Sequence, residues 1–87
     1  MIRIWAYTTV ETKITRSFIY ESIDTFSPEK FRFHIEKICH ELDIPTPVIL
    51  KTNIDNFDEF NIVSFSKHDF IESVDFEKFT LENAILS

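Results

Sequence analysis

One long amphipathic segment constrains the fold of this chain more than any other feature. Between Ser27 and Asp43, five apolar residues recur at helical spacing, so they fall on one stripe of an α-helix. Pro28 suits the first helical position, and Ser27 precedes it as a candidate N-cap. The helix is expected to end near Asp43, because Pro45 biases the residue before it towards an extended conformation. The stripe consists of Phe31, Ile35, Ile38, Cys39 and Leu42.

Shorter elements surround this helix in the sequence. Alternating apolar and polar side chains, rich in β-branched and aromatic residues, predict strands. The first two strands are close enough in sequence to form an antiparallel hairpin. Residues 48–50 are an apolar run that is either a strand or a buried crossing, and residues 70–76 a pinned loop or one helical turn. The other predicted elements are strands at 2–10 and 14–23, a short helix at 52–60, and strands at 62–65 and 79–85.

This order indicates an α+β fold in a single domain, residues 1–87. We expect a mainly antiparallel sheet, formed by the N-terminal hairpin and C-terminal strands, with one long helix packed on one face, in the order ββα(α)ββ. Both faces of the hairpin carry large apolar groups, and the helix can cover only one. Trp5 and Tyr7 suit the other face, because each has an apolar body and a polar tip.

The chain contains no glycine. A Walker A loop, a Rossmann turn and a nucleophile elbow all need glycine for close backbone approach, so their usual forms are excluded. The hairpin turn is expected to be a loop of three to five residues rather than a tight turn. Positions with positive φ should fall to Asn or Asp. The candidates are Asn53, Asn56, Asn61 and Asn83.

The acidic residues are unevenly distributed. Acids and bases balance through Lys51, whereas residues from Thr52 onward hold eight acids against Lys67 and Lys78, which accounts for the net charge of −6. An acidic surface repels phosphate backbones, so we expect no direct binding to nucleic acid and none to a membrane. The acidic portion is either a solvated face that aids solubility or a surface complementary to a basic partner.

Cysteine usage and hydropathy indicate an intracellular protein. Cys39 is the only cysteine, which rules out an intramolecular disulfide, and its place on the stripe favours a buried small hydrophobe over a reactive thiol. Residues 1–7 are apolar but lack the length and cleavage site of a signal peptide. No segment approaches the ~18 apolar residues of a membrane span. A cytoplasmic location is therefore expected.

Candidate functional residues are few. Phe33 and His40 are seven residues apart and share the helix face opposite the stripe, where they are either single exposed residues or part of a contact surface. The residues around His34, Cys39 and His68 lack the spacing of a zinc site. We therefore assign no catalytic, cofactor-binding or metal-binding residue and expect no cofactor. The predicted interaction surface comprises Trp5, Tyr7, Phe33 and His40.

Several short motifs resemble a family of short, uncharacterised bacterial proteins of the low-GC Gram-positive type. The resemblance spans nearly the whole chain and implies a C-terminal strand after Phe79 and a cytoplasmic setting. It implies no functional residue. The chain departs from the family pattern near Ile49, where relatives carry Trp, and in the hairpin turn. The matching residues are Arg3-Ile4-Trp5, Glu41-Leu42-Asp43, Pro47, Asn53, Phe57, Asp69-Phe70-Ile71-Glu72 and Asp75-Phe76-Glu77.

Three functional hypotheses follow from the sequence. The first is a non-enzymatic, acidic protein-interaction module that binds a protein partner or itself through a sheet face or edge. The second is an acidic inhibitor or regulator of a basic, nucleic-acid-binding partner. The third is a small-molecule or enzymatic site between helix and sheet, near His34 or His68.

Overall fold

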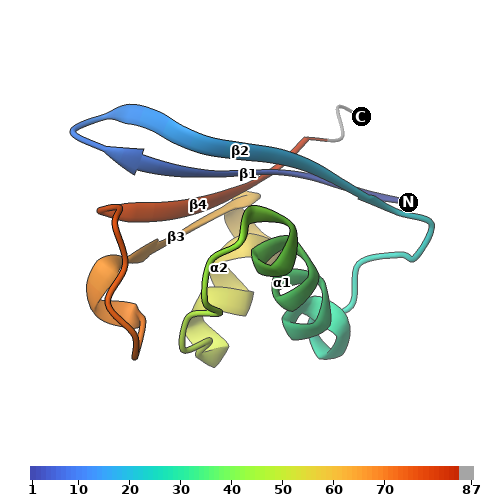
Figure 1. Ribbon diagram of the computed structural model, residues 1–87. Coiled ribbons are helices and arrows are strands. Elements are labelled where there is room, and N and C mark those ends of the chain that lie inside the picture. Colours follow the sequence, from blue (N-terminus) through green and yellow to red (C-terminus); the bar gives the residue numbers. More distant parts are fainter. Residues whose placement is uncertain (85–87) are drawn as a thin grey trace.

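The computed structural model describes residues 1–84, which form a two-layer α+β domain. One layer is a four-stranded sheet with the order β2-β1-β4-β3, in which every neighbouring pair is antiparallel. The other layer contains the two helices (Figure 1). In chain order the elements are β1 (Ile2–Val10), β2 (Lys13–Ser22), α1 (Pro28–Leu42), α2 (Lys51–Phe60), β3 (Ile62–Ser66), the 3-10 turn η1 (Lys67–Asp69) and β4 (Lys78–Asn83).

Both helices lie on the same face of the sheet, below it in Figure 1. The α+β class, the antiparallel sheet and the long helix on one face are confirmed. The short helix predicted at 52–60 is α2, which packs against β3, β4 and α1, so two helices rather than one long helix alone cover this face. β1 and β4 occupy the centre of the sheet, so the two ends of the chain form its middle and β2 and β3 its edges.

The predicted stripe of α1 is confirmed as the centre of the core. All five stripe residues are buried, and they meet the buried side chains of the sheet. Phenylalanine rings fill much of the layer between helices and sheet: the Phe31 and Phe57 centroids are 4.9 Å apart, and those of Phe65 and Phe79 are 6.1 Å apart. The loop after η1 bends several times without forming a helical turn and is pinned by Phe70 and Phe76, whose rings meet edge to face at 5.2 Å.

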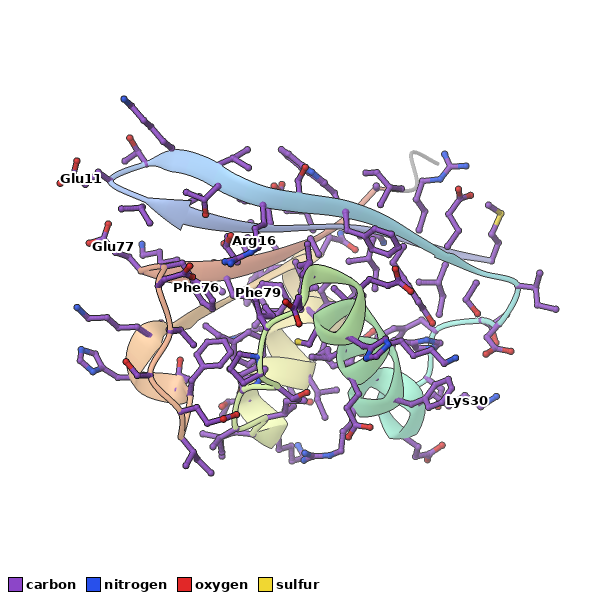
Figure 2. The ribbon with its side chains drawn as sticks, in the orientation of Figure 1. Glu11, Arg16, Lys30, Phe76, Glu77 and Phe79 are labelled. Atoms are coloured by element: carbon purple, nitrogen blue, oxygen red, sulfur yellow. The ribbon has the colours of Figure 1, made fainter. Side chains whose placement is uncertain are left out.

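The hairpin turn differs from the prediction. It has two residues, Glu11 and Thr12, with φ of 49° and 69°. The backbone N–H of Glu11 donates to the Glu77 carboxylate, and the Glu77 N–H donates to the Thr9 carbonyl, so the loop before β4 holds the tight turn in place. Figure 2 shows Glu11 at the tip of the hairpin with Glu77 beneath it. The expectation of a longer loop was wrong because these tertiary contacts offset the backbone strain.

Other left-handed positions match the prediction in part. Asp43, which ends α1, and Asn61, which ends α2, have φ of 56° and 62°. The expectation was wrong for Asn53, Asn56 and Asn83, none of which has positive φ. Asn53 is used differently, since its Oδ1 accepts a hydrogen bond from the Leu50 N–H at 2.7 Å and so supports the start of α2.

A β-bulge changes the face of the sheet to which the side chains at the start of β2 point. The pairing shifts between Thr8 and Thr9, so Thr9 lies opposite Ile14, and Thr15 occupies the extra position. The Thr8 and Thr15 hydroxyls lie 2.8 Å apart and bridge the irregularity. Strict alternation would place Ile14 on the same face as Phe18, but the bulge turns Ile14 to the opposite face.

Three further expectations concern the start of α1, residues 48–50 and the end of the last strand. Ser27 precedes α1 but does not cap it, because its hydroxyl donates to the Glu29 carboxylate at 3.1 Å instead. Residues 48–50 are an extended crossing in which Ile49 is buried, not a strand. The last strand was predicted to reach Ile85, a position outside the described residues.

Thr12→Gly is expected to stabilise the domain by about 1 kcal/mol, because a β-branched residue is costly at positive φ and glycine is not. Urea unfolding followed by circular dichroism measures the change. Thr52→Gly is the matched control, since the same substitution within α2 should cost a few tenths of a kcal/mol rather than stabilise the domain. Equal losses at both positions would contradict a strained turn.

Candidate functional site

The face of the sheet turned away from the helices has no covering layer within residues 1–84 (Figure 1). Along β1 the alternation is strict: Ile4 and Ala6 are buried under the helices, whereas Trp5 and Tyr7 point to the opposite side and remain partly exposed. We call this opposite side the open face.

The register of the sheet aligns four side chains across the open face. Trp5 on β1 lies between Ile19 on β2 and Glu82 on β4, and Glu82 in turn lies opposite Ile62 on β3. Ile19 and Ile62 are 50% and 41% exposed. These four residues, Ile19, Trp5, Glu82 and Ile62, form a line perpendicular to the strands that we call the cross-strand band.

A second line, which we call the hydroxyl row, runs beside this band. It consists of Ser17, Tyr7, Thr80 and Ser64, one residue from each strand. The Tyr7 hydroxyl donates to the Glu82 carboxylate at 2.6 Å, and the Ser64 and Thr80 hydroxyls lie 3.0 Å apart. Burial, reinforced by the Glu82 carboxylate, raises the pKa of Tyr7 to about 12, so Tyr7 remains a neutral donor.

The open face is electrically neutral although the chain is not. The register places four charged residues on it, namely Arg3, Glu21, Lys78 and Glu82. Arg3 and Glu21 form an ion pair at 3.0 Å. Two positive and two negative side chains cancel, so the net charge of −6 arises from the remainder of the molecule.

The acidic residues after Thr52 largely serve local structure. Asp75 forms a bidentate ion pair with Arg16 at 2.8 and 3.2 Å, and Asp69 accepts the Ser66 N–H at 2.8 Å. Glu77 accepts the N–H of Glu11. The Arg16 guanidinium holds the pKa of Asp75 below its usual range. With Asp55, which pairs with Lys51, and Glu82, which accepts from Tyr7, five of the eight acids after Thr52 have a partner within the chain.

The four predicted interaction residues do not form one surface. Trp5 and Tyr7 lie together on the open face, with ring centroids 4.3 Å apart. Phe33 and His40 lie on the outer side of α1, in the other layer. Phe33 is 50% exposed and is covered in part by the Lys37 ammonium, 5.1 Å from its ring.

His34 and His68, near which a small-molecule site was expected, lie far apart in the fold. His34 is fully buried on α1 beside the edge strand β2, and its Nδ1 lies 2.6 Å from the Tyr20 hydroxyl. Its Nε2 has no hydrogen-bond partner among the described residues. His68 is exposed in η1, next to the other edge strand. The stripe spacing could have revealed the buried histidine, because His34 is three residues from Phe31 and four from Ile38.

At least three concavities accompany this architecture, and none of the three is lined by His34. A cavity of about 140 Å³ between α2 and the sheet is lined largely by apolar side chains, including Ile2, Ile4 and Phe57. A groove of about 580 Å³ lies on the open face beside the hydroxyl row, and His68 is at its rim. Within residues 1–84, no group of three His, Cys, Asp or Glu side chains could hold a metal ion.

Comparison with known proteins identifies no relative of this chain. No protein-family model matches the chain, and searches of curated proteins and of solved structures give no match. Among the described residues, no helix is long and apolar enough to cross a membrane. The open face is therefore the feature of the molecule that bears on its function.

Proposed function

We propose that this chain is a protein-interaction module whose binding surface is the open face of its sheet. The observation that carries the proposal is the cross-strand band. It places an indole and two half-exposed isoleucines in register on a neutral surface of an acidic protein. Aromatic anchors among apolar contacts are typical of the centre of protein interfaces. The hydroxyl row and the ion pairs supply the polar surround.

A photo-crosslinking experiment tests this proposal in living cells. A photoreactive amino acid at position 19 or 62 should give discrete covalent adducts with protein, and mass spectrometry identifies the attached chain. The same group at position 33 is the matched control on the outer side of α1, where exposure equals that of Ile19. Adducts only at position 33 would move the binding surface to α1, and a lack of adducts at 19 and 62 would overturn the proposal.

A further inference from the structure

We infer that the partner of the open face is a second copy of this chain, related by a twofold axis that runs parallel to the strands between β1 and β4. This inference rests on the proposed function. In this arrangement each cross-strand band lies on the other, so the apolar side chains of both copies are removed from water together.

The neutral charge of this face permits self-association. Two copies that each carry −6 repel wherever their acidic surfaces meet. The open face carries two charges of each sign, so a second copy meets little net repulsion there. A twofold interface must also be complementary to itself. A neutral surface with both donors and acceptors satisfies this condition, whereas an acidic surface does not.

The order of side chains in the band makes it complementary to itself. A twofold axis parallel to the strands keeps the band in line but reverses the order of strands. Ile19 of one copy then faces Ile62 of the other, and Trp5 faces Glu82 of the other. The indole N–H of Trp5 has no hydrogen-bond partner within residues 1–84, and Glu82 uses one oxygen to accept from Tyr7. The arrangement provides the indole N–H with a carboxylate acceptor and places the isoleucines of one copy against those of the other.

The size of the face sets the expected affinity. Four strands about 4.8 Å apart, with about seven residues on average at about 3.3 Å per residue, give a face of roughly 19 by 23 Å. Two such faces bury on the order of 900 Å², which is less than a standard stable interface and in the range of weak, transient ones. We therefore expect a reversible dimer with micromolar affinity, so sedimentation equilibrium should span micromolar to millimolar protein.

A charge-complementation experiment tests the axis. Ile19→Lys alone and Ile62→Asp alone each place an unpaired charge against an isoleucine, so each should weaken the dimer at least ~100-fold. An equimolar mixture should recover a dimer that contains one chain of each kind, because the lysine at 19 then faces the aspartate at 62. Both positions are half-exposed, so the single variants should fold, and circular dichroism checks this. Ile71→Lys, at a position 91% exposed in the loop before β4, is the control that should leave the dimer unchanged.

Each outcome of these measurements supports or overturns a stated part of the proposal. A wild-type chain that stays monomeric to millimolar concentration overturns the second copy as partner, while photo-crosslinks from position 19 to a different protein would still support the interaction module. A wild-type dimer whose two variants fail to complement each other overturns the axis. Trp5 fluorescence gives an independent readout, since dimerisation should shift its emission to shorter wavelength in the wild type but not in Ile19→Lys.

Discussion

Ile38→Asp is expected to unfold the domain at room temperature. Ile38 is fully buried at the centre of the α1 stripe, and an aspartate there loses the apolar contacts and places an unpaired charge in the core. A loss of more than about 4 kcal/mol is comparable to the whole stability of a small domain. Circular dichroism should show the loss of helix and strand signal, and a thermal melt should lack a cooperative transition.

Phe33→Asp is the matched control on the same helix. It also replaces a large apolar residue with aspartate, but Phe33 is half exposed on the outer side of α1. The variant should retain a cooperative melt, with a loss of about 1 kcal/mol from helix propensity and the ring contacts. A cooperative melt for Ile38→Asp, or unfolding by Phe33→Asp, would show that the helix faces are wrongly assigned.

Acidification is expected to destabilise the fold through His34. Burial lowers the pKa of this imidazole, Lys30 and Lys37 add to the effect, and Asp24 opposes it. The unfolded chain therefore binds a proton that the folded chain does not. The contribution to the free energy of unfolding is fully present above pH ~6.5 and falls by up to about 1.4 kcal/mol per pH unit until the folded pKa is reached.

The measurement is a series of urea unfolding curves between neutral pH and the onset of carboxylate protonation. His34→Asn keeps an acceptor for the Tyr20 hydroxyl but cannot bind a proton, so its pH dependence should be flatter than that of the wild type. His68→Asn, at an exposed position, should leave the wild-type slope intact. If His34→Asn and wild type share one slope, the buried imidazole does not control the acid response.

Much of the fold was predictable from local patterns. The α1 stripe and the start of β1 at Ile2 follow from periodicity, and both are confirmed. The errors cluster where tertiary contacts outweigh local preference. The two-residue turn exists because Glu77, distant in sequence, holds Glu11, and the bulge at Thr15 reverses the face of Ile14.

The candidate surface was predictable only in part. Trp5 and Tyr7 were expected on an uncovered face because both sides of the hairpin are apolar. Ile19, Ile62 and Glu82 were missed, because their alignment with Trp5 depends on strand order and register, which no local pattern encodes. Phe33 and His40 share the outer side of α1, as their spacing indicates, but belong to the other layer of the domain.

By itself the sequence determined the elements, the buried stripe and the exclusion of glycine-dependent phosphate and nucleophile motifs. Each depends on residues close along the chain. Only the tertiary structure decided that β1 and β4 are central, that one sheet face is open and that this face is neutral. The physical reason is that strand pairing joins residues far apart in sequence. A surface that such pairing assembles has no counterpart in any single segment.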